Sequence, residues 1–217
     1  MNNYKGMIGM LKRFIFALVG FFLMLSSSVS VAAETPEVFV ERVSNEVLTA
    51  IAADPKVQAG DKKAVERLVD DLMMPNVDFL RMTRMAVGPK WRQATPEQQQ
   101  RLQYLFRETL ISVYSGGLSL ASDQTVRILP HGQNDGTEAI VRTGMKSKSD
   151  PSKPEVVMVY RLRNVKEKGW QVIDVNVEGV WLVSNYRSQY GNIAAQEGID
   201  GLIRRMEEQL KNTTEKK

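Results

Sequence analysis

Apolar residues recur every three or four positions through the first half of the chain that follows residue 33, and this is the spacing of amphipathic helices. The fourth helix has the clearest beginning, because Thr95, Pro96 and Gln98 supply a threonine cap, a proline at the first helical position and a capping-box partner. The four predicted helices run from Thr35 to Asp54, from Asp61 to Pro75, from Val77 to Val87 and from Thr95 to Gly116.

The spacing changes to alternation of apolar and polar residues after Ser122, which predicts β-strands. Short polar connections between these segments favour an antiparallel meander. The third segment is apolar from Val156 to Tyr160, so we expect both faces of the sheet to be covered there. The chain becomes helical again from Ile199 to Leu210. The four predicted strands cover residues 125–129, 137–145, 155–164 and 170–177, and the fold class is α+β, with helices around a four-stranded antiparallel sheet.

Residues 1–33 have the three parts of a cleaved secretory signal peptide. Lys5, Lys12 and Arg13 precede an apolar run at residues 14–25, and small residues follow it. The run is shorter than the ~20 residues that a membrane-spanning helix needs. We expect cleavage after Ala33, with Ala32 as the alternative, which leaves a single domain of residues 34–217 outside the cytoplasm.

The signal segment also accounts for most of the positive charge. The whole chain has a net charge of +4, whereas residues 34–217 carry 26 basic and 25 acidic side chains, a net charge of +1. A global basic field for nucleic acid is therefore not supported. The chain has no cysteine, which excludes disulfides, thiolate chemistry and attachment of a lipid to an N-terminal cysteine. We expect an untethered monomer.

Signatures of enzymes are scarce in this sequence. His131 is the only histidine, and it lies in a predicted turn. The segment around Ser119 resembles a nucleophile elbow, but that motif needs a strand before its serine and a helix is predicted here. Phosphate loops and metal motifs are absent from the sequence. We expect no enzyme, no cofactor and no metal site, and a hydrolase using Ser119 and His131 is the last alternative.

Two compositional biases concern binding. Residues 34–80 carry a net charge of −5, whereas residues 81–107 carry +5. Either these are solvated helix faces that partly complement each other, or the basic block docks an acidic partner or anionic headgroups. Met73, Met74, Met82 and Met85 form the second bias, because flexible methionines suit sites that adapt to apolar ligands.

Three stretches together resemble a known family. They are the segment from Ala86 to Ala94, the pattern Trp170-x-x-x-Asp174-x-x-x-Glu178-Gly179-Val180, and the run from Leu182 to Tyr190. The chain resembles the MlaC family, also called the toluene-tolerance auxiliary family, of periplasmic phospholipid-binding proteins. Two departures are Val87, where leucine is usual, and Trp181, where a small residue is common. Trp181 would place a bulky ring near a pocket entrance.

The resemblance implies an apolar cavity that holds phospholipid tails as cargo, with the headgroup outside. It also implies a shuttle between an outer-membrane lipoprotein-porin complex and an inner-membrane ABC transporter complex, which maintains outer-membrane lipid asymmetry. The candidates for tail contact, any of which could instead fill a dry core, are Met82, Met85, Phe106, Leu110, Val113, Tyr114, Val157, Val159, Ile173, Val175, Val177 and Leu182.

The candidates for headgroup contact or docking are Trp91, Arg92 and Arg187. Arg187 could face a phosphate, or it could bind backbone carbonyls or Asp174. The alternative function is a periplasmic chaperone or adaptor whose apolar groove binds protein segments.

Overall fold

The computed structural model describes the backbone of residues 34–215, so the predicted signal peptide lies outside the described residues. Its helical elements are α2 Pro36–Ala53, α3 Pro55–Gln58, α4 Lys62–Leu68, η1 Val69–Met73, η2 Met74–Asn76, α5 Phe79–Val87, η3 Gly88–Gln93, α6 Pro96–Tyr114, η4 Ser115–Gly117, α7 Leu118–Ala121 and α8 Leu182–Glu215. Its strands are β1 Gln124–Asn134, β2 Glu138–Ser147, β3 Val156–Val165, β4 Gly169–Val177 and β5 Val180–Trp181.

Polar side chains set the helix beginnings that the sequence predicts. The Thr35 hydroxyl accepts a hydrogen bond from the Val38 backbone nitrogen at the start of α2. Thr95 and Gln98 form the predicted capping box of α6, in which each side chain accepts from the backbone nitrogen of the other residue. The Asp61 carboxylate accepts from the Ala64 nitrogen at the start of α4. These bonds satisfy amide groups that a helix leaves without partners in its first turn.

The sheet is an antiparallel meander in the order β1-β2-β3-β4-β5. It contains the four predicted strands and a fifth strand that the sequence did not predict. β5 has two residues, too few to show alternation, and a two-residue turn connects it to β4. Glu178 and Gly179 in that turn both have positive φ, at 48° and 91°, as tight hairpin turns require.

A register shift in β4 decides which of its residues share a face. Val175 pairs with Tyr160, and Val172 pairs with Leu162, so three steps on β4 correspond to two steps on β3. Ile173 lies within this irregularity, which has the two-against-one count of a β-bulge. Val172 and Val175 therefore share a face although their spacing is odd.

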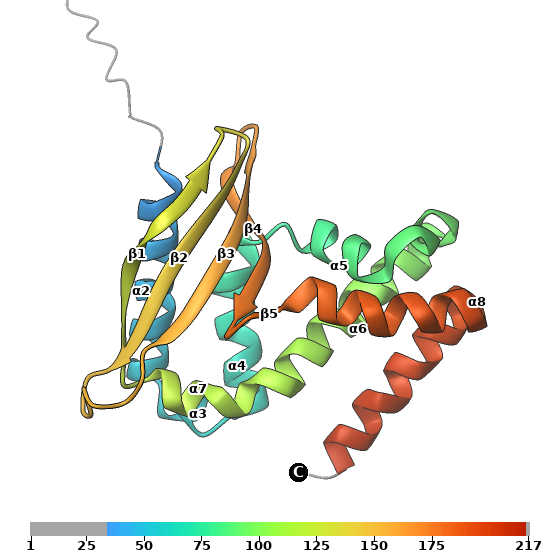
Figure 1. Cartoon of the computed structure of the whole chain (residues 1–217). Helices are drawn as coiled ribbons and strands as arrows, with labels where there is room; N and C mark the ends of the chain where they lie inside the picture. The colour runs from blue at the N-terminus through green and yellow to red at the C-terminus, as the bar shows by residue number, and fades with distance from the viewer. Residues whose placement is uncertain (1–33, 216–217) are drawn as a thin grey trace, which may run out of the picture. The chain divides into compact units, whose positions relative to one another are not determined.

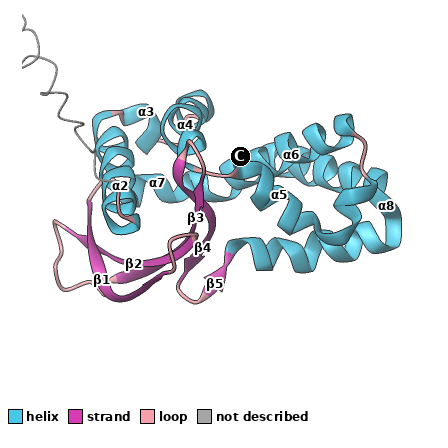
Figure 2. Ribbon diagram, turned by 90° about the horizontal axis from the view of Figure 1, so that it is seen from above, coloured by secondary structure: helices cyan, strands magenta, loops and turns pink. Residues whose placement is uncertain are grey.

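Helices cover one face of the sheet over β1, β2 and β3, as Figures 1 and 2 show. We call this the inner face. Phe39 and Val40 of α2 pack there against Val141 of β2 and Leu162 of β3. None of the described helices lies over the opposite, outer face of these three strands (Figure 1).

The expectation that both faces of the sheet are covered at β3 is therefore wrong for the outer face. Val157 and Val159 point to the outer face and are only half-buried. Arg142 on β2 is the cross-strand partner of Val159. Long arginine side chains can shield apolar neighbours with their aliphatic stems, which explains how apolar residues persist on an open face.

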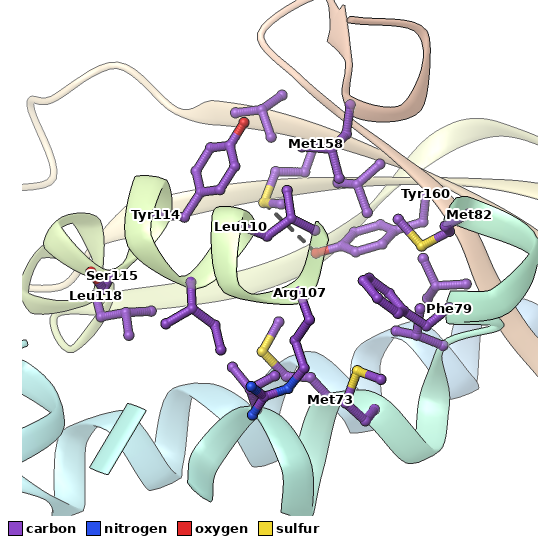
Figure 3. Close-up of a pocket in the computed structure, with 18 of the residues that line it drawn as sticks. Met73, Phe79, Met82, Arg107, Leu110, Tyr114, Ser115, Leu118, Met158 and Tyr160 are labelled. Atoms are coloured by element: carbon purple, nitrogen blue, oxygen red, sulfur yellow. Dashed lines mark hydrogen bonds between the residues drawn. The ribbon is translucent and has the colours of Figure 1, made fainter. Parts of the chain in front are cut away.

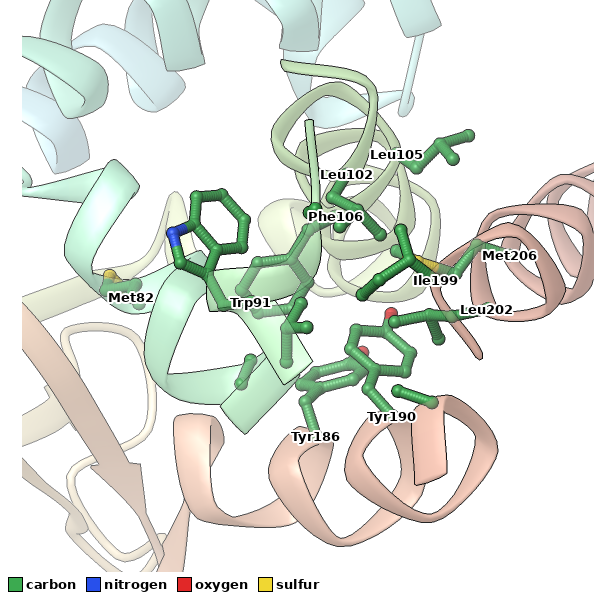
Figure 4. Close-up of a cluster of buried hydrophobic side chains, with 14 of the residues drawn as sticks. Met82, Trp91, Leu102, Leu105, Phe106, Tyr186, Tyr190, Ile199, Leu202 and Met206 are labelled. Carbon is green, nitrogen blue, oxygen red and sulfur yellow. The ribbon is translucent and has the colours of Figure 1, made fainter. Parts of the chain in front are cut away.

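A second core joins α5, η3, α6 and α8, and we call these elements the helical lobe. The Phe106 ring, fully buried, lies at its centre and contacts the rings of Phe79, Tyr186 and Tyr190 at centroid distances of 5.0–5.8 Å. Trp91 and Met206 belong to the same cluster (Figure 4). Burial raises the pKa of Tyr186 to about 12, so its hydroxyl stays neutral.

Gly198 changes the direction of α8 within the helical lobe. Its φ of 75° and ψ of −175° belong to a region that is essentially restricted to glycine. The residues after it return along α6, where Arg101 binds Glu207 and Gln98 binds Asp200. The sequence predicted a helix from Ile199 to Leu210, but it did not predict the helical segment before Gly198.

We expect Gly198→Ala to lower the free energy of unfolding by about 1–3 kcal/mol, because an alanine at this backbone conformation is strained. No atom lies within 4 Å of the position of an added Cβ, so the loss would report the backbone alone. Gly191→Ala is the matched control, since Gly191 lies in the same helix with equally open space and no positive φ. Urea denaturation measures the free energy of unfolding of both variants. An equal loss in Gly198→Ala and Gly191→Ala would contradict the view that the backbone conformation of Gly198 requires glycine.

Asp174 connects the sheet to α8. Its carboxylate accepts hydrogen bonds from the backbone nitrogens of Val175 and Val183, each at 2.9 Å. Its side chain is buried, and desolvation raises the pKa of the carboxyl above its ordinary value, although the two backbone bonds oppose this. The ionised form therefore reduces stability, and this cost is absent below the ordinary pKa and fully present above the raised one.

We expect the free energy of unfolding of Asp174→Asn, relative to the parent protein, to increase as the pH rises from about 3 to about 7. Asparagine keeps the acceptor oxygen and removes the buried charge, and the other carboxyls titrate alike in both proteins. Urea denaturation at several pH values measures the difference. A difference that stays constant or falls with pH would contradict the raised pKa.

Candidate functional site

An apolar cavity of about 520 Å³ lies between the inner face of the sheet and the surrounding helices (Figure 3). This volume is within the range of small-molecule binding sites. The lining residues come from α4, η1, η2, α5, α6, η4, α7, α8, the strands β3, β4 and β5, and the connection between η2 and α5. They are Val65, Val69, Met73, Met74, Val77, Phe79, Met82, Arg107, Leu110, Ile111, Tyr114, Ser115, Leu118, Met158, Tyr160, Val172, Val175, Val177, Val180, Leu182 and Asn185.

The helical wall contains three of the four clustered methionines. Met73 and Met74 come from η1 and η2, and Met82 comes from α5. η1 is a π-helical turn, a widened helical form that is frequent at functional sites. Flexible thioether side chains allow this wall to adapt to apolar ligands of different shape.

The sheet wall is formed by alternate residues of β3 and β4. Met158 and Tyr160 point inward from β3, and Val175 and Val177 are their cross-strand partners on β4. The Tyr160 hydroxyl donates a weak hydrogen bond to the Met158 sulfur at 3.7 Å (Figure 3). Burial raises the pKa of Tyr160, so this wall carries no charge from the phenol.

Arg107 is the only charged side chain among the described residues that line the cavity, and two carboxylates compensate its charge. Its guanidinium binds the Asp70 carboxylate at 2.7 Å and the Glu108 carboxylate at 2.5 Å. Lys62 also binds Glu108, which raises the pKa of that lysine. This ion cluster holds α4 and η1 against α6, so the role of Arg107 in the cavity wall is structural.

Exposed apolar residues mark the mouth of the cavity. Met73, Tyr114, Val177 and Val180 line the cavity and are 39–58% exposed. They come from η1, α6, β4 and β5, so the mouth opens between the end of the sheet and these helices. Tyr114 also brings a hydroxyl to the mouth (Figure 3).

Six of the twelve residues that the sequence proposed for tail contact line the cavity. They are Met82, Leu110, Tyr114, Val175, Val177 and Leu182.

The other six candidates lie elsewhere. Phe106 and Met85 pack in the helical lobe, and Val113 is exposed on α6. Val157 and Val159 lie on the outer face of the sheet, because the even-numbered residues of β3 are the ones that face inward. Ile173 is buried but leaves the inner face at the β4 irregularity, where Val172 takes the lining position.

The candidates for headgroup contact or docking are dispersed. Trp91 is 6% exposed in the core of the helical lobe. Arg92 and Arg187 are exposed on η3 and α8, and neither lines the cavity. Trp181 is also outside the lining, because its ring lies under the Arg161 guanidinium at 4.6 Å, whereas its neighbours Val180 and Leu182 face the cavity.

The basic block of residues 81–107 is partly neutralised by ion pairs. Arg81 binds Glu138, Arg101 binds Glu207, and Arg107 binds Asp70. Only the last pair joins the basic block to the acidic block of residues 34–80.

The residues of the last alternative, a hydrolase, do not lie in the local structure that such a site needs. Ser119 lies in the short helix α7, which follows η4 and α6 and no strand. His131 is exposed on β1 with a φ of 68°, at the irregular part of its pairing with β2. The described residues also contain no group of three or more histidines and carboxylates that could hold a metal ion.

Sequence reasoning missed most of the sheet wall and the turn at η1 and η2. The clustering of Met73 and Met74 was a usable signal for the turn. The alternation of Met158 and Tyr160 was hidden, because β3 is apolar at consecutive positions and hydrophobicity does not identify its inner face.

Comparisons with known proteins agree with this geometry. A family model described as MlaC protein matches residues 41–208. The toluene tolerance protein ttg2D of Pseudomonas putida is 29% identical over 195 residues, which are 89% of this chain and 87% of that protein. The intermembrane phospholipid transport system binding protein MlaC of Haemophilus influenzae is 20% identical over 186 residues, which are 85% of this chain and 86% of that protein.

A solved structure has the same fold and a bound ligand. It is the phospholipid-binding protein of Ralstonia solanacearum in complex with a phospholipid, with a TM-score of 0.76 and 32% identity, and the match covers 84% of this chain and 99% of that one. The family model covers well over half of the chain, and the resemblance that the sequence motifs indicated is confirmed. The chain therefore belongs to the MlaC family, which is a family of phospholipid-binding transport proteins and not of enzymes.

Proposed function

We propose that this protein is a phospholipid carrier of the periplasm, and that its cavity holds the acyl tails of its cargo. The observation that carries the proposal is the apolar cavity of about 520 Å³, which opens to the surface through a mouth of exposed apolar residues. The phospholipid-binding relative with the same fold supports it. No described helix is both long and apolar enough to cross a bilayer.

The energetics of acyl chains explain why a carrier is needed. Burial of one methylene contributes about 0.8 kcal/mol, so two tails of about fifteen methylenes each resist entry into water by roughly 20–25 kcal/mol. Transfer from a bilayer to this cavity exchanges one apolar environment for another. The net affinity is therefore modest, and the direction of transport has to come from partners that favour loading or release.

The polar headgroup stays outside the cavity in this proposal. Asp70 and Glu108 compensate the charge of Arg107, so the wall offers no unpaired charge to a phosphate. Tyr114 is exposed at the mouth, and Asn185 is exposed on α8 while it lines the cavity. These two polar side chains can bind a headgroup that remains in contact with water.

The pathway is the finer part of the proposal. The protein would carry lipid from an outer-membrane lipoprotein-porin complex to an inner-membrane ABC transporter complex, and so maintain outer-membrane lipid asymmetry. The predicted signal peptide at residues 1–33 and membership of the MlaC family support this assignment.

We expect the mature protein, isolated from a bacterial periplasm without detergent, to carry co-purified phospholipid. Native mass spectrometry followed by lipid extraction measures both the occupancy and the number of acyl chains. Protein that is empty when freshly isolated from a membrane-containing lysate would contradict the proposal. Capture of unfolded outer-membrane proteins without any bound lipid would instead favour the chaperone alternative.

We expect Val175→Trp to reduce the phospholipid bound per protein by roughly half or more, because the larger side chain fills the cavity from the sheet wall. Val159→Trp makes the same exchange on the outer face of the adjacent strand, and we expect it to leave the lipid content unchanged. Lipid extraction from both variants, with circular dichroism as the test of folding, makes the comparison. Loss of lipid only in Val159→Trp would show that the two faces have been assigned the wrong way round.

A further inference from the structure

The outer face of the sheet carries a row of residues that the lipid cavity does not use. Leu129, Arg142, Val159, Asn176 and Trp181 are successive cross-strand partners from β1 to β5. No described helix covers this face over β1, β2 and β3 (Figures 1 and 2).

Four arginines dominate this face, and we call them the arginine face. They are Arg127 on β1, Arg142 on β2, and Arg161 and Arg163 on β3. Neighbouring positions hold Val157 and Val159, which are half-buried. The surface presented to a partner therefore combines four guanidinium groups with half-buried valines, and Lys146, Glu138 and Glu155 lie on the same face.

The arginines differ in how far their charge is compensated. Arg127 binds Glu155 through two hydrogen bonds, and Arg161 stacks on Trp181 and faces the buried Asp174. Arg142 and Arg163 form no ion pair with any described carboxylate. Glu138 is opposite Arg163 on β2, but its carboxylate binds Arg81. These two arginines thus remain available to an external anion.

The geometry points to the arginine face as a docking site for an anionic phospholipid bilayer surface. Guanidinium groups bind phosphates through two parallel hydrogen bonds, and tryptophan is enriched where proteins meet the headgroup layer. A protein partner is less well matched, because the residues that dominate protein interfaces lie in well-packed, fully desolvated pockets at the centre of the interface. Here the apolar residues lie half-buried beside the arginines.

Docking through this face would place the cavity mouth beside the headgroups, and this step rests on the proposed function. β5 is shared by both sites, because Val180 lines the mouth whereas Trp181 lies on the outer face under Arg161. The attraction is weak for so few unpaired charges, and salt screens it. A carrier that has to leave the membrane again needs such a reversible contact.

Co-sedimentation with vesicles tests the inference directly. The probe is vesicles of phosphatidylethanolamine and phosphatidylglycerol at about three to one, in about 0.05 M salt, with pure phosphatidylcholine vesicles as the neutral comparison. We expect the parent protein to bind the anionic vesicles, to ignore the neutral ones, and to dissociate in about 0.5 M salt. The double variant Arg142→Gln/Arg163→Gln loses roughly thirtyfold in affinity.

The matched control is Arg67→Gln/Arg84→Gln, which removes the same charge from two exposed arginines on α4 and α5. We expect this control to bind the vesicles like the parent. The inference is overturned if the parent does not bind the anionic vesicles, or if both double variants weaken binding equally. It is also overturned if a cross-linker placed at position 163 captures a protein in place of the membrane. Lipid extraction from the Arg142→Gln/Arg163→Gln protein keeps the two proposals apart, because unchanged lipid content would leave the carrier function standing when docking fails.

Discussion

The rest of this structure depends on keeping the apolar cavity open, although the side chains that line it would gain contacts if they packed together and filled it. Protein interiors are packed as densely as organic crystals, and side chains around an empty space lose dispersion contacts. The walls are therefore held by interactions outside the cavity. The Phe106 cluster makes the helical lobe rigid, and Asp174 joins β4 to the first turn of α8. The ion pair between Arg107 and Asp70 holds η1 against α6. In the proposed function, a phospholipid tail would add dispersion contacts to these walls.

The helix beginnings and the meander could be predicted because local chemistry determines them. Thr95 and Gln98 bind each other's backbone, and this needs no information from distant residues. The first half of α8 was not predicted, although Val183, Tyr186 and Tyr190 have helical spacing and are buried. The two serines and the asparagine between them, and the glycine that follows Tyr190, have low helix propensity. The tertiary contact of these tyrosines with Phe106 overrides that propensity.

The cavity was harder to predict than the fold, because a residue that faces an empty space and one that fills a core have the same hydrophobicity. Phe106 and Leu110 are one turn apart on the apolar side of α6. One lies at the centre of the helical lobe, whereas the other lines the cavity. The difference depends on which elements lie opposite each turn, and that is a property of the assembled structure. The basic block was likewise a poor guide to where unpaired positive charge lies, since three of its arginines bind carboxylates, whereas Arg142 and Arg163 of the sheet form no ion pair with a described carboxylate.

The irregularity in β4 has a consequence for how relatives of this protein can be aligned. At identities of 29–32%, the length of a strand is a weak guide to the position of a gap. A relative with one residue fewer near Ile173 would keep Val172 and Val175 on the cavity wall with regular alternation. Counting positions along such a strand would assign its cavity residues to the wrong side. Equivalent positions in the family are therefore better defined by their cross-strand partners on β3, such as Tyr160 and Leu162, than by their order in the sequence.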